Sequence, residues 1–206
     1  DLRTPLTAIK GLVINLQDTA PEAIQASLRT LDEQTDRLVR LVDDLLVLSR
    51  LQRGELGLHC SEIDLGATAS SAVAIAKEKA RRLGVTLTLE SSADLPLVVG
   101  DADRLQQVVI NLVDNAMKAT PAGGAIQVQV AVKGSRVTLA VTDNGMGLTS
   151  EEAARAFEPY YRGSGRGAGL GLAISQEILT AHDGVIWLRP RPEGGAQAGF
   201  SLAAVS

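Results

Sequence analysis

The sequence has 206 residues, which allows one large or two small domains. Its formal net charge of -4 argues against a general nucleic-acid binder, because such proteins are usually basic. A single cysteine, Cys60, excludes an internal disulfide framework, and no apolar run reaches the roughly 18 residues that a membrane-spanning helix needs.

Residues 1–19 are predicted to form a helix, because apolar residues recur there at steps of three and four. Pro5 lies inside this pattern and should kink the helix near its start. A second, longer helix follows Pro21 and runs to about Gly54. Its apolar seam is Leu28, Leu31, Thr35, Leu38, Val42, Leu45 and Leu48. A two-helix hairpin cannot bury this seam alone, so we expect a second copy to complete a four-helix bundle; the alternative is a coiled-coil linker without chemistry.

From Ser61 onward the pattern changes to mixed helix and strand. Asp64 is a candidate N-cap for a helix that runs to about Arg82, acidic residues from Asp101 open another helix, and a last helix is predicted over residues 169–181. The predicted strands are residues 85–90, 97–100, 125–132, 136–142, 184–188 and 197–203. Helices on one face of a mixed sheet make a two-layer α/β sandwich. We therefore expect an α+β chain, with a helical hairpin at residues 1–57 and a sandwich domain at residues 58–206.

A glycine-rich stretch runs from Val141 to Ile174, and it passes from a strand through a turn and a loop into a helix. Glycines let the main chain approach a ligand and expose its N–H groups, and a helix N-terminus favours anions. Asp143 stands at the strand end, where it could accept a hydrogen bond from the far end of the same ligand. ATP would satisfy both features, whereas the alternative is a flexible surface loop.

A second polar element lies upstream, on the helix that Asp101 is predicted to open. Asn111 and Asn115 are four residues apart and share one face, while the other side of this helix is apolar. Mg²⁺ takes oxygen ligands and keeps several waters. Two amides and Lys118 at this spacing can therefore hold a hydrated Mg²⁺ and a polyphosphate.

These residues carry a family resemblance. The N-terminal DLRTPLTAIKG resembles the H box of sensor histidine kinases without its first residue, and NLVDNAMK at 111–118 resembles the N box. DNGMG at 143–147 resembles the first glycine box, FEPYYR at 157–162 the F box, and GAGLGL at 167–172 the second glycine box. Together these ordered motifs span essentially the whole chain, which looks like the catalytic core of a two-component sensor histidine kinase with a GHKL-type ATP-binding domain.

The resemblance implies that a phosphoacceptor histidine immediately precedes Asp1, so we expect the sequence to be a fragment of a longer protein. Asp1 would act as general base for that histidine, and Thr4 would orient the water that dephosphorylates the partner response regulator. Without that histidine the fragment is expected not to accept a phosphoryl group at the usual position. His59 and His182 are interpreted as structural or exposed, since neither has a motif of its own.

The same resemblance assigns the nucleotide site. Asn115 would be the main Mg²⁺ ligand, Asn111 would lie next to it on the phosphates or their water, and Lys118 would neutralise phosphate charge. Asp143 would accept the adenine amino group, and Gly145 and Gly147 would let the ring lie against the main chain. Buried asparagines that tie strand ends, and an aspartate that only forms a turn, are the structural alternatives. The phosphate loop would consist of Gly167, Gly169, Leu170 and Gly171.

The F box is predicted to form a lid. Phe157 would be a hinge or packing residue, and Tyr160 and Tyr161 are similar lid candidates. Arg162 would reach the γ-phosphate, or it would be a solvated lid arginine. The family usually carries an aromatic residue or histidine after the N-box lysine, and Ala119 at that position would open one side of the adenine pocket.

The function that the resemblance implies is ATP-dependent autophosphorylation of a histidine, with phosphotransfer to, or dephosphorylation of, a response regulator aspartate. The cofactors would be ATP and Mg²⁺, and the partners a second copy of the chain and the receiver domain of the regulator, with no nucleic acid. The expected location is cytoplasmic, with membrane attachment only through segments of the parent protein outside this sequence. The alternatives are an ATPase or serine kinase of the same nucleotide-binding fold, disfavoured by Asn111 where the hydrolysing relatives tend to carry glutamate, and a phosphatase or adaptor-only dimerisation module, disfavoured by the intact Asn115 and Asp143.

Overall fold

The computed structural model describes residues 57–161 and 169–205, together with residues 9, 10, 13, 24, 28, 31, 35, 38 and 42. The chain divides into two compact units, Asp1–Leu56 and Gly57–Ser206. All the described positions of the first unit are helical, while the ends and the kink predicted for the two N-terminal helices lie outside the described residues. Within the described part of the chain, no helix is both long enough and apolar enough to cross a bilayer.

Side chains along the predicted N-terminal seam differ in exposure. Leu28 and Thr35, seven residues apart, are buried at 6% and 8% exposure. Leu31 and Leu38, also seven residues apart, are exposed at 53% and 49%. A seven-residue step keeps residues on one stripe of a helix. The seam therefore carries one buried stripe and one apolar stripe that faces solvent.

The second unit is built on a five-stranded sheet with the strand order β2-β4-β5-β7-β6. The first pair of neighbours is parallel, and the other three pairs are antiparallel. β1 and β3 form a separate ribbon of two antiparallel strands. The strands are β1 (Ser61–Ile63), β2 (Thr86–Ser91), β3 (Val98–Gly100), β4 (Ala125–Lys133), β5 (Arg136–Asp143), β6 (Val185–Pro190) and β7 (Ala196–Ala203).

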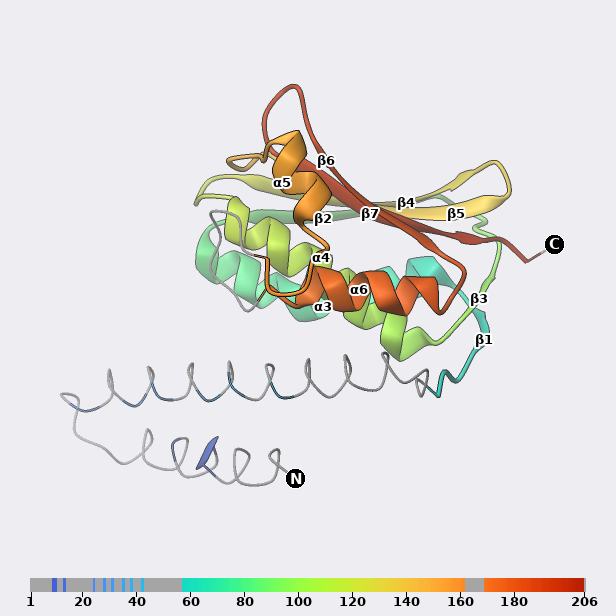
Figure 1. The fold of residues 1–206 in the computed structure, drawn as a ribbon, viewed down its shortest axis with the longest axis horizontal. Coiled ribbons are helices and arrows are strands. Elements are labelled where there is room, and N and C mark those ends of the chain that lie inside the picture. Colours follow the sequence, from blue (N-terminus) through green and yellow to red (C-terminus); the bar gives the residue numbers. More distant parts are fainter. Residues whose placement is uncertain are drawn as a thin grey trace. The chain divides into compact units, whose positions relative to one another are not determined.

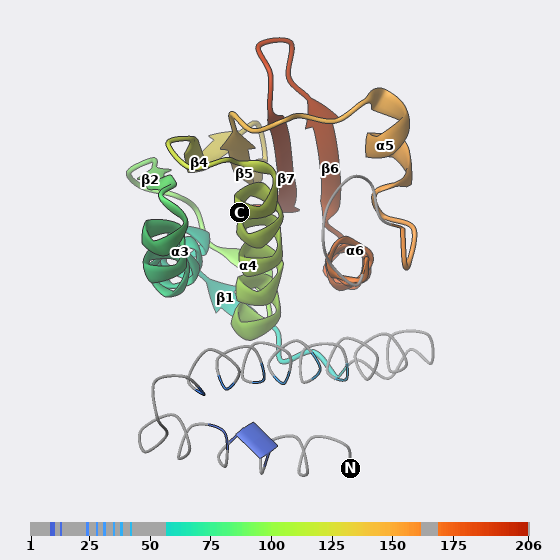
Figure 2. The same ribbon diagram turned by 90° about the vertical axis from the view of Figure 1, so that its left-hand side faces the viewer.

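Three helices cover one face of this sheet, as Figures 1 and 2 show. α4 (Ala102–Ala119) lies between α3 (Leu65–Leu83) and α6 (Gly171–Thr180), and it contacts both. The short α5 (Ser150–Arg155) lies beside β6 at the sheet edge. The predicted α+β class, a mixed sheet with helices on one face, is confirmed.

The alternation of side chains along β5 decides where the candidate site lies. Val137, Leu139 and Val141 are at most 1% exposed and face the helices. Successive side chains of a strand point to opposite faces, so Asp143 continues this inward set. A carboxylate therefore stands on the helix-facing side of the sheet, at the end of a central strand, and it is only 5% exposed.

The local signals for helix ends were mostly correct. The Asp64 side chain accepts hydrogen bonds from the N–H groups of Gly66 (2.7 Å) and Ala67 (3.2 Å), as predicted for an N-cap. The last helix begins at Gly171 and not at Gly169, because the Gly169 carbonyl accepts a hydrogen bond from the Tyr160 N–H (2.8 Å) and holds that residue in the loop. The sequence analysis missed β1, a strand too short to show a periodic pattern.

Candidate functional site

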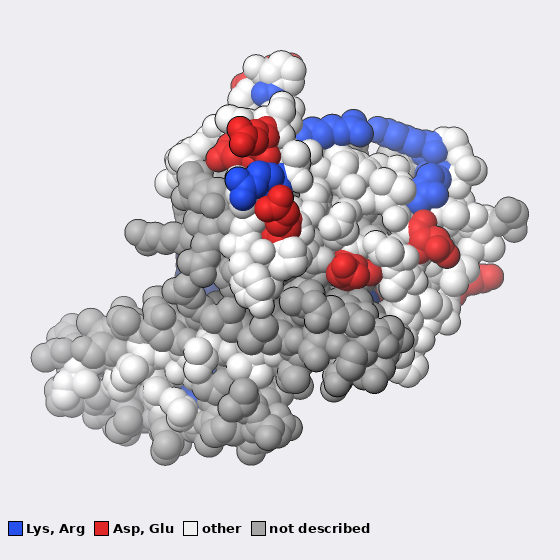
Figure 3. All heavy atoms as spheres, viewed as in Figure 1, with Lys and Arg blue, Asp and Glu red and all other residues white. Residues whose placement is uncertain are grey.

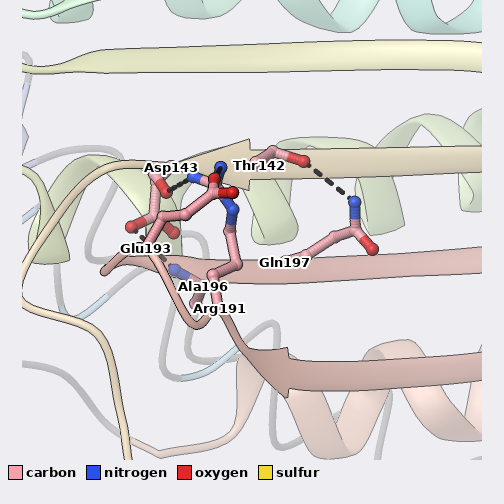
Figure 4. Close-up of polar contacts among 6 residues, drawn as sticks. All are labelled: Thr142, Asp143, Arg191, Glu193, Ala196 and Gln197. Atoms are coloured by element: carbon pink, nitrogen blue, oxygen red, sulfur yellow. Dashed lines mark hydrogen bonds and ion pairs between the residues drawn. The ribbon is translucent and has the colours of Figure 1, made fainter.

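Asp143 is held by main-chain donors from two separate parts of the chain. Its Oδ1 accepts hydrogen bonds from the N–H of Gly145 (2.9 Å) and the N–H of Ala196 (3.3 Å). Burial raises the pKa of this carboxyl above its ordinary value, while these two N–H groups and the positive charge of Arg191 oppose the rise. Figure 4 shows Ala196 and Arg191 beside Asp143. Both contacts from the described residues go to Oδ1, so Oδ2 remains an acceptor for a ligand.

The turn after Asp143 packs against the end of α4. The N–H of Met146 donates to the carbonyl of Ala119 (3.1 Å), the last residue of that helix. A Cβ at Gly145 would lie 2.3 Å from the same carbonyl oxygen, so no larger residue fits without moving the main chain. Gly145 was predicted to let a ligand approach the main chain, and the structure adds a contact inside the protein that also requires glycine.

The two asparagines of α4 lie on the side that is not packed against the sheet. The Asn111 amide nitrogen donates to the carbonyl of Gly171 (3.2 Å) and to the hydroxyl of Ser175 (3.3 Å), which ties α4 to the first turn of α6. Lys118 donates to the amide oxygen of Asn115 (3.4 Å). The predicted apolar side of the helix is buried, and it consists of Leu105, Val108, Val109, Leu112, Val113 and Ala116.

The start of α6 is the predicted phosphate end. Leu170, at its N-cap position, makes no side-chain capping bond, and its own side chain is 1% exposed. Gly171, the first residue of the helix, lies within van der Waals reach of the Asn111 side chain. Unpaired N–H groups at a helix N-terminus favour an anion.

The F box meets the second glycine box at the base of the predicted lid. The hydrogen bond from the Tyr160 N–H to the Gly169 carbonyl joins the F box to the second glycine box. The guanidinium of Arg155 lies over the ring of Tyr161, 4.5 Å from the centre of that ring. Charged side chains gather over α5 (Figure 3), where a capping box begins at Thr149. The predicted site residues Asp1, Thr4, Arg162 and Gly167 lie outside the described residues.

The two histidines have no catalytic surroundings among the described residues. His182 Nε2 accepts a hydrogen bond from the N–H of Asp101 (2.9 Å), and its Nδ1 lies 2.7 Å from the carbonyl of Ile178. The ring thus joins the end of α6 to the start of α4. The His59 main chain donates to the Asp101 carboxylate (3.0 Å), while its side chain is exposed. These contacts agree with the structural interpretation of both residues.

The residues of the β6–β7 loop that contact Asp143 were not predicted from the sequence. Arg191 Nη1 donates to the Asp143 carbonyl oxygen (2.9 Å), and Arg191 also pairs with Glu193 (3.0 Å). An open hollow of about 400 Å³ separates this loop from Thr149 and Glu152 at the start of α5. The adjacent glycines Gly194 and Gly195 were the only local signal that this loop comes close to another main chain.

Two families match the chain. The family described as "Histidine kinase-, DNA gyrase B-, and HSP90-like ATPase" matches residues 100–205, and "His Kinase A (phospho-acceptor) domain" matches residues 1–54. The alginate biosynthesis sensor protein KinB of Pseudomonas aeruginosa is 38% identical over 96% of this chain, which covers 34% of KinB. The signal transduction histidine-protein kinase BaeS of Escherichia coli is 32% identical over 98% of this chain, which covers 44% of BaeS. The chain thus spans less than half the length of either relative.

Solved structures point to the same family. Full-length ShkA, crystallised in complex with AMPPNP, has a TM-score of 0.82 and 31% identity, and the match covers 100% of this chain and 44% of ShkA. The catalytic domain of the histidine kinase ThkA has a TM-score of 0.65 and 28% identity, and the match covers 71% of this chain and 96% of that domain. The chain therefore belongs to the two-component sensor histidine kinases, with a His Kinase A region followed by a domain of the histidine kinase-, DNA gyrase B- and HSP90-like ATPase family.

Proposed function

We propose that this chain is the catalytic core that moves the γ-phosphoryl group of ATP to a histidine and then to an aspartate of a response regulator, and that also removes it from the regulator. The observation that carries this proposal is the contact between the Asp143 turn and the end of α4, through the Met146 N–H and the Ala119 carbonyl (3.1 Å). Ala119 lies one helical turn beyond Asn115. This contact supports the proposal that Asp143, as acceptor for the base, and Asn115, as ligand of the phosphates, belong to one site.

Asp143 is proposed to select adenine. Its Oδ1 is occupied by two main-chain donors, and its Oδ2 can accept a hydrogen bond from the exocyclic amino group of the base. Guanine carries a carbonyl oxygen at the corresponding position, which would face the carboxylate oxygen without a proton between them. A site whose buried acceptor is left unpaired rejects the wrong ligand strongly. ATP is therefore the preferred nucleotide.

Asn115, Asn111 and Lys118 are proposed to hold the phosphates and a Mg²⁺ ion. The donor set fits this ion, because amide oxygens are hard ligands and Mg²⁺ completes its shell with water and phosphate oxygens. No cluster of three or more His, Cys, Asp or Glu occurs within the described residues, so a carboxylate cage is not available there. Bound Mg²⁺ would neutralise charge on the phosphates. Lys118, now 3.4 Å from the Asn115 oxygen, would add a second positive charge.

The main chain at the start of α6 and the glycine box before it are proposed to bind the remaining phosphate oxygens. Gly167, Gly169, Leu170 and Gly171 would contribute N–H groups, and Arg162 would reach the γ-phosphate. The absence of a side-chain cap at Leu170 supports this proposal, since the N–H groups of that turn then need another partner.

The N-terminal hairpin is proposed to form a homodimer and to carry the acceptor histidine immediately before Asp1, with Asp1 as its general base and Thr4 as the residue that positions water for dephosphorylation. The exposed apolar stripe of Leu31 and Leu38 supports pairing of two hairpins in a four-helix bundle. Leu31→Glu with Leu38→Glu should give a monomer in light scattering, while Ile75→Glu, on an exposed position of α3, should not. A monomeric unmodified chain would refute the dimer.

The kinase proposal is tested by adding one histidine before Asp1 and incubating the chain with Mg²⁺ and γ-labelled ATP. We expect an acid-labile, alkali-stable label on the extended chain, and none when Asp143→Ala is introduced as well. The label should then pass to the aspartate of a receiver domain. Label on the chain without the added histidine would identify a different acceptor. If neither the extended nor the unextended chain binds the nucleotide, the proposed function is wrong.

A further inference from the structure

The β6–β7 loop supplies two of the groups that hold Asp143. Arg191 Nη1 donates to the Asp143 carbonyl oxygen (2.9 Å), and the Ala196 N–H donates to the Asp143 Oδ1 (3.3 Å). These residues follow Asp143 by 48 and 53 positions, and they come close because β7 pairs with β5. Figure 4 shows Arg191 reaching from the loop to Asp143, with Glu193 beside it.

The loop main chain lies directly against Asp143. A Cβ at Gly195 would lie 2.0 Å from the Asp143 carbonyl oxygen, so only glycine permits this approach. The carbonyl of Gly195 in turn faces Gly147, where an added Cβ would lie 3.2 Å from it. The first glycine box and the β6–β7 loop are therefore packed as one unit around the carboxylate.

Of the charged side chains near Asp143 that the structure describes, Arg191 is the one that acts on its carboxylate. Burial raises the pKa of the Asp143 carboxyl, and Arg191 is the charged group that opposes this rise among the described residues. Glu193 pairs with Arg191 but is 82% exposed. Glu152, across the hollow from the loop, accepts from the N–H of Thr149 (2.8 Å), and Lys118 of α4 donates to Asn115.

We propose that Arg191 is a positioning residue for base recognition, which fixes the peptide of Asp143 and keeps its carboxylate charged as the acceptor for the adenine amino group. This role rests on the proposed function, because it presupposes that Asp143 reads the base. The β6–β7 loop then contributes to the nucleotide site through Arg191, which acts on Asp143.

The test compares Arg191→Gln, which keeps an N–H donor but removes the charge, with Arg191→Lys, which keeps the charge. Calorimetry measures ADP affinity at a series of pH values from neutral to acid, because a carboxyl with a raised pKa loses its charge earlier on acidification. For Arg191→Gln we expect about tenfold weaker ADP binding near neutral pH, because the hydrogen bond to the Asp143 carbonyl loses its positive charge. On acidification, the ADP affinity of this variant should begin to fall at a higher pH than that of the unmodified chain. For Arg191→Lys the pH at which affinity falls should stay near that of the unmodified chain.

Glu193→Gln is the matched control, because it removes the exposed partner of Arg191 and leaves the contact with Asp143 in place; its binding curve should follow that of the unmodified chain. If Arg191→Gln binds ADP with the same affinity and the same pH profile as the unmodified chain, Arg191 has no positioning role. If the unmodified chain itself fails to bind ADP at every pH, the proposed function fails instead. Thermal melting of each variant distinguishes a binding defect from unfolding.

Discussion

The two ends of the candidate nucleotide site are built in different ways. At the base end, Asp143 closes a central strand, is 5% exposed and is held by the main chain of Gly145 and Ala196. At the phosphate end, Asn115 is partly exposed and Lys118 is exposed, and the contact between them is long at 3.4 Å. A buried and hydrogen-bonded group is positioned before the ligand arrives, whereas groups near solvent are ordered largely by the ligand. Substitutions that change side-chain volume should therefore affect base recognition most. Phosphate binding should be affected most by changes in side-chain charge and by removal of Mg²⁺.

The largest effect is expected at Asp143. Asp143→Ala removes the proposed acceptor for the base and leaves the N–H groups of Gly145 and Ala196 without this partner, so ADP affinity should fall about 100-fold. Affinity for inorganic pyrophosphate, measured by the same calorimetry, should not change, because pyrophosphate does not reach the base end. Gln129→Ala, at an exposed position of β4, is the control. An equal loss for both ligands would contradict a division of the site into two ends.

Asn115→Ala should weaken nucleotide binding about tenfold when Mg²⁺ is present, because the proposed oxygen ligand of the ion is lost. When Mg²⁺ is removed with a chelator, the variant and the unmodified chain should bind ADP with similar affinity. Calorimetric titrations with and without the ion measure this difference. The same loss under both conditions would assign Asn115 to direct contact with the nucleotide and not to the metal.

Glycine substitutions compare the steric tolerance of the two ends. Gly145→Ala places a Cβ 2.3 Å from the Ala119 carbonyl oxygen, so it should lower the free energy of unfolding by about 1–3 kcal/mol. Gly171→Ala places its Cβ at an ordinary contact distance, 3.6 Å from the Asn111 side chain, so it should leave the free energy of unfolding almost unchanged. Urea denaturation measures both values. Equal destabilisation would show that Gly145 is no more tightly packed than Gly171.

The smallest effect concerns stability and pH. Burial raises the pKa of Asp143 above its ordinary value of 3.8, so the folded chain binds this proton more tightly than the unfolded chain. The contribution of Asp143 to the free energy of unfolding therefore falls as pH rises from 3.8 to the raised value, and it stays constant at higher pH. Asp143→Asn should stabilise the nucleotide-free chain near neutral pH and lose that advantage at acid pH. A difference that does not vary with pH would show that the folded and unfolded pKa values are alike.

Much of the fold could be predicted from the sequence, because its signals are local. Alternating polarity predicted β2, the helical spacing of apolar residues predicted α4, and Asp64 marked the start of α3. β1 escaped because three residues carry no periodicity. The start of α6 was wrong by two residues, since Gly169 is held in the loop by Tyr160, a contact that the local sequence does not reveal.

The sequence by itself determined which residues could serve a nucleotide, because Asn111, Asn115 and Asp143 stand in motifs whose spacing can be read along the chain. Only the tertiary structure decided what surrounds Asp143. The pairing of β5 with β7 brings Arg191 and Ala196 to that carboxylate, and no pattern of local spacing records a contact made across about fifty residues. Charge and hydrogen bonding at a buried acid depend on such distant neighbours, so the chemistry of this site is a property of the folded sheet.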